Sequence, residues 1–449
     1  MLNKIGHQYE SSLDFPTFLE SLILNLLMKK RISREQTFLE IFLVSLALIF
    51  AGTQAKADNP LLPGIRIAII GNTFADQLRS HGYLETLLLQ HWRDEPVSIR
   101  NLGWAGDRLR IRDRPTNFPT EESTLRDHQT DVIIACFGMG ESFEGEKGIE
   151  NFKTDLKAFI GSHRGKQYNG ESDVRLILVS PIAYEDLGEL TPRLQERNRE
   201  LQIYTDAMQK VAENESVPFV DLYGPTRALM SIPDAIPLTI NGIHLSEYGY
   251  WVASRILYDG FFETESGIGD QPWQISIDAK SENSDARGLS LSGLSSNRRE
   301  ISFQATEEAS PSLPPPTQRK PPTALNSRRD TMVVKNLQPG KYVLMIDGER
   351  VASATEDEWA EGVAIDSSPA HREGEAFREA VNDKNQQFIY SWKALNQVHI
   401  VGERRNSPSG RALPAEILEF KALANEKDAA LEGGIELKTR EWRIIPDTN

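Results

Sequence analysis

The chain has 449 residues, of which 39% are hydrophobic and 26% charged, so it is long enough for two globular domains. Its formal net charge of −15 argues against nucleic acid or an anionic membrane as a main partner, because both are themselves negative. The single cysteine, Cys136, cannot form an internal disulfide. It lies in an apolar run, so we interpret it as a small core residue rather than a nucleophile.

Residues 1–57 are typical of a targeting segment. A basic stretch at residues 29–34 precedes an apolar run, Phe38–Ala51, and an Ala-Lys-Ala sequence at 55–57 fits a signal-peptide cleavage site. The proportions are those of a signal peptide that starts at Met28, behind a misassigned N-terminal extension; the alternative is an uncleaved membrane anchor. We expect a secreted or periplasmic protein that begins directly after this segment and keeps no stable membrane span.

Residues 58–265 alternate between two kinds of pattern. Five short apolar runs predict buried parallel strands: Ile65–Ile70, Val97–Gly103, Asp131–Gly138, Val174–Pro181 and Val217–Tyr223. Helical spacing predicts helices at Phe74–Trp92, Glu150–His163 and Gln195–Glu213, and a last one from an N-cap at Ser246 to about Tyr258. Arg108–Asp127 is predicted to be an irregular excursion. This alternation predicts an α/β domain, a flavodoxin-like three-layer α/β/α fold around a parallel sheet.

Residues 266–449 predict a β-rich C-terminal region. Strands are expected at Trp273–Asp278, Gly288–Leu294, Glu300–Ala305 and Val398–Val401, a hairpin-like pair at Thr331–Ala354 with turns at Gly340 and at Asp347-Gly348, and a helix at Glu373–Leu395. Residues 306–330 are rich in Pro, Ser and charge, and predict a disordered insertion, partly polyproline II, that limited proteolysis should cut first. No metal-ligand cluster is evident in this region, and we expect neither a metal nor a cofactor.

Four short segments follow the predicted strands: Gly71–Thr73, Gly103–Asp107, Gly138–Glu141 and Asn241–His244. In open α/β sheets, sites are built where the carboxyl ends of the strands meet. Ester hydrolysis needs a nucleophile, a nearby base and hydrogen-bond donors for the oxyanion. Among these segments, Thr73 offers a hydroxyl, His244 a suitable base, and Asn241 a partner to orient the imidazole ring.

The order and placement of these segments resemble the SGNH (GDSL-type) hydrolases over roughly Ile65–Phe262. In that family a Gly-Asp-Ser-Leu block, a glycine block, a Gly-x-Asn-Asp block and an Asp-x-x-His block follow in turn. The matching stretches here are Gly71–Phe74, Asn101–Asp107, Gly138–Glu141 and Asn241–His244. Phrases such as FGMGESFEG and LTINGIHLSEYGYW are similar to a secreted branch of the superfamily common in planctomycete-like bacteria.

The resemblance implies an exported hydrolase that acts on ester bonds, with acylated carbohydrates or small acyl esters as substrates. It implies Thr73 as nucleophile, His244 as base, and Asn241 in the place of the triad acid. It implies that the N–H groups of Thr73 and Gly106 bind the oxyanion, together with the position held by Gly140. Asp107 and Glu141 are expected to satisfy loop N–H groups rather than act as acids, and Trp104 to pack.

Three positions depart from the family pattern: Thr73 replaces the serine, Gly140 the oxyanion asparagine, and Asn241 the acid. Loss of the acid costs about 10⁴ in turnover in a well-studied serine protease, and loss of one oxyanion donor costs roughly 10²–10³. A non-catalytic binding module that kept the scaffold and lost its triad is therefore the alternative. A third hypothesis is a nucleotide binder that uses Gly71–Thr73 to bind phosphate. It is weaker, because no Gly-x-Gly-x-x-Gly or P-loop sequence follows the first strand.

Overall fold

The computed structural model describes residues 61–448 except 63, 96, 115–117, 263–271, 318–328 and 397–402. The chain divides into a unit of residues 1–58 and a unit of residues 59–449, and the described residues all belong to the second. The targeting segment, the strand expected at Val398–Val401 and residues 318–328 of the Pro/Ser-rich insertion lie outside them. Among the described residues, no helix combines the length and apolar character needed to cross a membrane.

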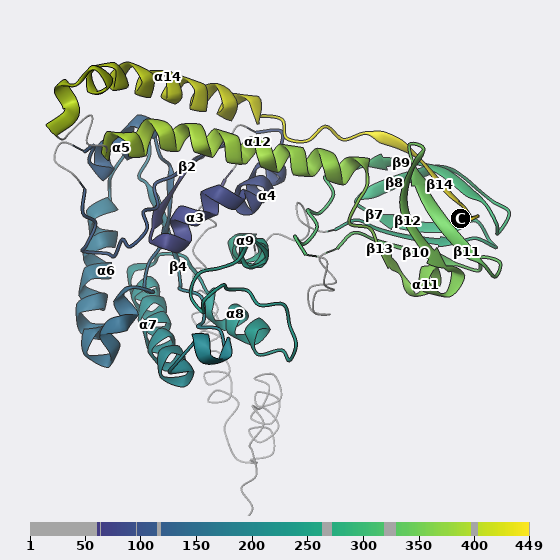
Figure 1. Ribbon diagram of the computed structural model, residues 1–449, viewed down its shortest axis with the longest axis horizontal. Coiled ribbons are helices and arrows are strands. Elements are labelled where there is room, and N and C mark those ends of the chain that lie inside the picture. Colours follow the sequence, from purple (N-terminus) through teal and green to yellow (C-terminus); the bar gives the residue numbers. More distant parts are fainter. Residues whose placement is uncertain are drawn as a thin grey trace, which may run out of the picture. The chain divides into compact units, whose positions relative to one another are not determined.

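A five-stranded parallel sheet with the order β2-β1-β3-β4-β5 forms the centre of the first domain, which confirms the predicted fold (Figure 1). Its strands are β1 (Arg66–Gly71), β2 (Ser98–Asn101), β3 (Val132–Cys136), β4 (Arg175–Val179) and β5 (Phe219–Val220). Because the chain adds β2 on one side of β1 and β3 on the other, the connections after β1 and β3 leave opposite faces of the sheet. This switch point is where such folds place their sites.

Helices cover both faces of the sheet. They are α3 (Thr73–His81), α4 (Tyr83–His91), α5 (Glu121–His128), α6 (Ile149–His163), α7 (Leu194–Glu215), α8 (Tyr223–Met230) and α9 (Glu247–Phe262). Alternate residues of β1 enter two separate cores: Ile67 and Ile69 pack with α4 and α9, and Ala68 and Ile70 pack with α6 and α7. A strand buried on both faces explains the uninterrupted apolar run in the sequence.

Two helix predictions in this domain were wrong. The single helix expected at Phe74–Trp92 is two helices, because Gly82 adopts a left-handed conformation (φ 67°) that ends α3. The irregular excursion expected at Arg108–Asp127 contains α5, whose N-terminus is capped by the Thr120 hydroxyl accepting from Ser123 N at 3.1 Å. The predicted cap of the last helix is confirmed, since Ser246 Oγ accepts from Gly249 N at 3.1 Å.

The C-terminal region contains two sheets, with the orders β13-β10-β6-β7 and β12-β11-β14-β9-β8. Their strands are β6 (Gln274–Asp278), β7 (Asn283–Arg287), β8 (Leu289–Ser296), β9 (Ile301–Glu307), β10 (Thr331–Lys335), β11 (Lys341–Ile346), β12 (Glu349–Thr355), β13 (Val363–Ala364) and β14 (Thr439–Pro446). The hairpin expected to turn at Gly340 is wrong, since β10 and β11 lie in different sheets. The hairpin is formed by β11 and β12, which turn at Asp347-Gly348.

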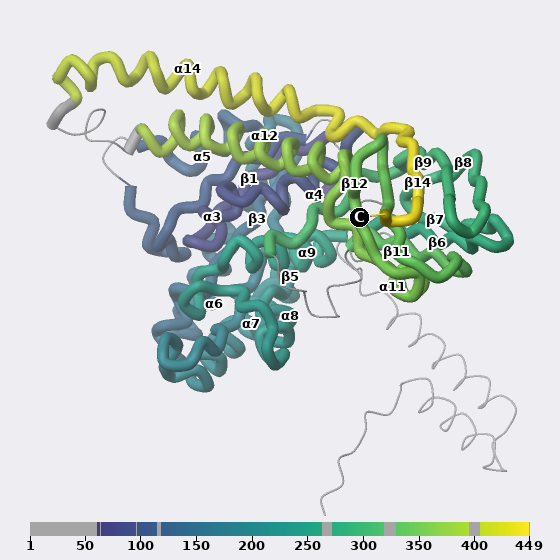
Figure 2. Tube along the Cα trace, turned by 45° about the vertical axis from the view of Figure 1, so that its right-hand side comes forward, coloured from purple at the N-terminus to yellow at the C-terminus, as the bar shows by residue number. Residues whose placement is uncertain are grey.

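Helices also belong to this region: α11 (Glu356–Glu361), α12 (Pro369–Trp392) and α14 (Pro408–Ala430), with 3-10 turns at Lys393–Asn396 and Glu403–Asn406. Two further 3-10 turns, Glu141–Gly148 and Gly188–Leu190, lie earlier in the chain. The helix predicted at Glu373–Leu395 is thereby confirmed as α12. Figures 1 and 2 show α12 and α14 side by side, with α12 beside α3 and α4 of the first domain. The C-terminal region is therefore not only β-rich, since its two long helices return to the central sheet.

The described start of the Pro/Ser-rich segment packs against the first domain. Leu313 is 4% exposed and belongs to the core that contains α9, and its carbonyl oxygen accepts from Trp251 Nε1 at 2.8 Å. At the other end of the segment, the buried Asp330 carboxylate accepts from Trp273 N at 2.9 Å and from Ser312 N at 3.1 Å. Both ends of the segment are thus fixed by buried hydrogen bonds.

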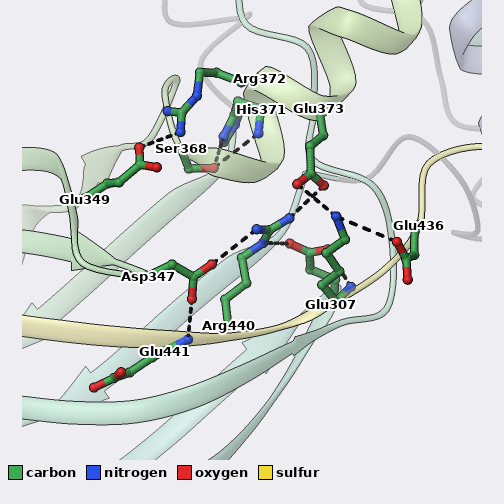
Figure 3. A network of polar contacts seen from close by, with 11 residues as sticks. Glu307, Asp347, Glu349, Ser368, His371, Arg372, Glu373, Glu436, Arg440 and Glu441 are labelled. Carbon is green, nitrogen blue, oxygen red and sulfur yellow. Dashed lines mark hydrogen bonds and ion pairs between the residues drawn. The ribbon is translucent and has the colours of Figure 1, made fainter.

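Polar contacts hold α12 near its start and in its middle. Figure 3 shows the first, in which Arg440 of β14 is enclosed by Glu307, Asp347 and Glu373, the last from α12. Further along α12, the Lys384 ammonium is completely buried, pairs with Glu85 of α4 and donates to Ile99 O at 2.9 Å. A buried charge that loses its partner is costly, so the helix position depends on this pair.

We expect Lys384→Met to lower the free energy of unfolding by about 3–5 kcal/mol, because it leaves the Glu85 carboxylate buried without its cation. Chemical denaturation measures the change, and Lys384→Met with Glu85→Leu should recover a substantial part of it. The exposed pair Lys421–Asp127, with side chains 45% and 57% exposed, provides the control. Lys421→Met should cost less than about 1 kcal/mol, and equal losses for the two lysine variants would contradict the importance of the buried pair.

Candidate active site

At the end of β1, the backbone lies very close to the backbone of β3. A Cβ atom on Gly71, whose φ is 152°, would lie 2.2 Å from the Cys136 carbonyl oxygen, so only glycine fits. The approach lets Asn72 N donate to that same oxygen at 3.2 Å. Asn72 then caps α3, with its Oδ1 accepting from Phe74 N at 3.0 Å, and Thr73 becomes the first residue of the helix.

The loop after β2 lies directly against this turn. Gly103 approaches α3 so closely that a Cβ atom there would lie 2.4 Å from Asp76 N. Asn101 fixes the approach by donating from Nδ2 to Ala75 O at 2.7 Å and accepting from Gly103 N at 2.9 Å. As a result, Gly106 N donates to Thr73 Oγ1 at 3.3 Å, and the two residues predicted to share the site are in contact.

His244 reaches the site on the turn before α9. Its Nδ1 lies 2.9 Å from Asn241 Nδ2 and 3.1 Å from Asn241 Oδ1, so the predicted pairing of the ring with Asn241 is present in the geometry. Asn241 Oδ1 also accepts from His244 N at 3.0 Å. Which face of the amide meets the ring depends on the assignment of its oxygen and nitrogen.

Glu185 anchors this turn, a role that no motif in the sequence indicates. Its buried carboxylate accepts from Leu238 N at 2.8 Å and from Thr239 N and Oγ1 at 2.6 and 2.5 Å. Thr239 in turn forms an isolated β-bridge with Leu245, which closes the turn that carries His244. A carboxylate that accepts several hydrogen bonds in a buried position gives the turn a fixed geometry.

Thr73, Gly106, Gly140 and His244 line one cavity of about 160 Å³. The rest of its wall is largely apolar and includes Phe74, Met139, Phe143, Ile182, Leu245 and Tyr250. Asn241 lies outside the cavity, behind the histidine. Both Thr73 and His244 are among the described residues, and no hydrogen bond joins their side chains, since the threonine hydroxyl faces Gly106.

The two carboxylates near the cavity have structural partners. Glu141 accepts from Gly138 N at 2.9 Å and Leu109 N at 2.8 Å, as predicted. Burial raises the pKa of its carboxyl, and these backbone bonds oppose the shift. Asp107 instead pairs with Arg114 at 2.6 Å, so the prediction that it binds loop N–H groups was wrong. Burial raises the pKa of Asp107 too, against the opposing effect of Arg114.

Cys136 is a core residue, as predicted, for it is 2% exposed and burial raises the pKa of its thiol to about 12. A thiol with such a pKa is uncharged at neutral pH and is a poor nucleophile. Among the described residues, no group of His, Cys, Asp and Glu side chains is arranged to hold a metal ion.

The far end of α12 supports the loop that carries Gly106. The Trp392 ring meets the Trp104 ring edge-on at 5.6 Å, and Lys393 Nζ lies 4.8 Å from the centre of the Trp104 ring. Lys393 also binds Asp76 of α3 at 2.5 Å. Trp104 thus packs, as predicted, against Phe118 of its own region and against Trp392 and Lys393 of α12.

The sequence of this domain agrees with its geometry. Residues 69–252 match the family model of the GDSL-like lipase/acylhydrolase family. Among curated proteins, none matches the chain.

Solved structures share the architecture. BT4096, a gut microbial diltiazem-metabolizing enzyme, is similar with a TM-score of 0.61 at 15% identity, over 88% of this chain and 100% of that one. A putative GDSL-like lipase from Parabacteroides merdae has a TM-score of 0.38 at 17% identity, over 45% of this chain and 97% of its own. An acetyl-xylooligosaccharide esterase from Geobacillus has a TM-score of 0.35 at 16% identity, over 44% and 94%. The first of these shares its fold with most of the chain.

We expect Trp392→Ala to lower the free energy of unfolding by about 3–5 kcal/mol, as for other buried aromatic side chains, and to loosen the loop at Trp104. Hydrogen exchange of a peptide that covers residues 101–107 should show faster exchange of this loop. Glu379→Ala, at an exposed position of the same helix, is the control and should change neither quantity. Unchanged exchange in Trp392→Ala would mean that α12 does not support the loop.

Proposed function

We propose that this protein is an exported ester hydrolase that acts on small acyl esters, including acylated carbohydrates. The observation that carries the proposal is the convergence of Thr73, Gly106, Gly140 and His244, from four separate segments, on one cavity. The family match of residues 69–252 supports the same reaction class. The cavity is smaller than the roughly 300–1,000 Å³ typical of sites for drug-sized ligands, which favours a short acyl group.

In the proposed reaction, Thr73 Oγ1 attacks the ester carbon and its proton passes to His244. The tetrahedral intermediate collapses, the leaving alcohol takes the proton from His244, and an acyl-threonine remains. Water, deprotonated by the same histidine, then attacks this acyl group and releases the acid and free Thr73. For this reaction the threonine hydroxyl has to turn from Gly106 towards the histidine, which frees the Gly106 N–H and, together with Thr73 N, forms the proposed oxyanion site.

Asn241 would determine which nitrogen of the His244 ring carries the proton. If Asn241 Oδ1 accepts from His244 Nδ1–H, the ring nitrogen Nε2 is left unprotonated and can take the proton of Thr73. A neutral amide orients the ring but stabilises the imidazolium less than a carboxylate does. Asn241 is exposed, so solvent can share in stabilising that charge.

A binding module without catalysis is the second candidate, and one observation favours it. The Thr73 hydroxyl accepts from Gly106 N rather than bonding to the histidine, and Gly140 offers no side-chain donor. Such a module would bind an acyl ester or carbohydrate in the same cavity without cleaving it. Dependence of activity on His244 separates the two candidates.

Export is part of the proposal and depends on residues 1–57. The basic stretch, the apolar run and the Ala-Lys-Ala sequence support cleavage before Asp58. N-terminal sequencing of protein secreted by a native-like host tests it. A mature chain that still begins at Met1 or Met28 would contradict it.

We expect His244→Ala to reduce kcat/KM on a short aryl acetate by about 10³ or more, because loss of the base disables the whole catalytic unit. Ile240→Ala, in the same turn with a side chain 65% exposed, is the matched control and should keep its activity. Thermal unfolding verifies that both variants are folded. If wild type hydrolyses the ester and His244→Ala does so equally well, the catalytic assignment is wrong.

We expect Thr73→Ser combined with Asn241→Asp to retain or raise this activity. One carboxylate oxygen can keep the bonds that Asn241 Oδ1 accepts from the N–H groups of Ile243 and His244, at 3.3 and 3.0 Å. The other oxygen can accept from His244 Nδ1 and stabilise the imidazolium. Steady-state kinetics of the double variant and of both single variants measure the effect, and inactivity of all three beside an active wild type would contradict it.

A further inference from the structure

The space beside Gly140 is filled by an arginine side chain. A Cβ atom on Gly140 would lie 3.1 Å from both Cγ and Nε of Arg108 and 3.5 Å from its Cδ. Gly140 occupies the position where the resemblance to SGNH hydrolases places the oxyanion asparagine. The Arg108 side chain therefore lies where the side chain of that asparagine would begin.

The cavity is short of hydrogen-bond donors at this position. Gly140 contributes no side chain, and the Gly106 N–H is bonded to Thr73 Oγ1 at 3.3 Å. The cavity wall beyond them is largely apolar. A negative charge that developed on a substrate oxygen here would need another donor, because charge in an apolar cavity is costly without one.

Arg108 is able to provide that donor. Arg108 is not itself among the residues that line the cavity, but it directly follows Gly106 and Asp107, which both line it. Its guanidinium is held by a contact of 3.4 Å with Glu144, and the two side chains are 34% and 52% exposed. Such exposed pairs contribute little, so the guanidinium can change partners at small cost. A guanidinium always carries its charge and offers several N–H donors.

We propose that Arg108 is a catalytic residue that donates to the oxyanion in place of the missing asparagine. The inference rests on the proposed hydrolase function. As Thr73 Oγ1 bonds to the ester carbon, the carbonyl electron pair moves onto its oxygen, the threonine proton moves to His244, and a guanidinium N–H donates to the oxygen. Collapse re-forms the carbonyl and expels the alcohol with the proton from His244, while Arg108 gives up no proton.

The test compares Arg108→Ala with Arg110→Ala in the full-length chain on a short aryl acetate. Arg110 is a matched control, because its side chain is 75% exposed and its pair with Asp155 is 3.6 Å long. Loss of one oxyanion donor lowers kcat by about 10²–10³ with little change in KM, and that is the result expected for Arg108→Ala. Arg110→Ala should stay close to wild type.

A rescue experiment distinguishes a catalytic role from a structural one. Gly140 has φ −69° and ψ −40°, which any residue can adopt, and removal of the Arg108 side chain makes room for an asparagine. The double variant Arg108→Ala, Gly140→Asn should therefore regain a large part of the lost kcat. Millimolar guanidinium ion should also raise the activity of Arg108→Ala, but not that of Arg110→Ala.

The outcomes separate this inference from the proposed function. Activity that depends on His244 but persists in Arg108→Ala would overturn the role of Arg108 and leave the hydrolase standing. A rise in KM alone would also overturn it, because Arg108 would then bind only the ground state. If wild type has no activity that depends on His244, the proposed function fails and this inference fails with it. Arg108→Met, which keeps much of the side-chain length but removes the charge and the N–H donors, decides the matter by the same readouts if Arg108→Ala does not fold.

Discussion

The site depends on one steric constraint, the contact between the backbones of β1 and β3 at Gly71. No side chain fits between Gly71 and the Cys136 carbonyl, and the resulting hydrogen bond from Asn72 N fixes where α3 begins. The start of α3 sets the position of Thr73, and the second glycine approach, at Gly103, brings the Gly106 loop against it. Gly71 and Gly103 therefore determine where the candidate nucleophile, Thr73, lies relative to the Gly106 loop.

The C-terminal region supports this site from the outside. Its β-sheets hold one end of α12 through Arg440, and the buried Lys384–Glu85 pair holds the middle of the helix on α4. The far end of α12 then packs on Trp104 and binds Asp76. An uncompensated charge at Lys384 would disfavour any other position of the helix, so the ion pair specifies where α12 docks as much as it stabilises it. The similarity in fold to BT4096 likewise extends over 88% of the chain.

The candidate site brings together side chains from four separate segments of the chain. His244 and its partner Asn241 are in contact, and the hydrogen bonds of Glu185 fix the turn that carries them. The nucleophile position has a threonine whose hydroxyl is already bonded to Gly106, and the oxyanion position has a glycine beside an arginine. An active enzyme would require a rotation at Thr73 and a new donor, whereas a binding protein would require neither. In the proposed reaction, the outcome therefore depends on two side chains, Thr73 and Arg108.

The five strands and their parallel sheet could be predicted from the sequence, because a strand that is buried on both faces leaves a continuous apolar run. The placement of Thr73, Gly106, Gly140 and His244 at one edge followed, because the carboxyl ends of parallel strands meet there. The sequence did not reveal the break at Gly82, helix α5 or the separation of β10 from β11, which follow from local caps and from long-range pairing. Only the tertiary structure decided what surrounds the site. Lys393 and Asp76 are 317 residues apart, and the side chain beside Gly140 belongs to another loop. Contacts of this kind depend on packing between distant segments, and no periodicity in either segment encodes them.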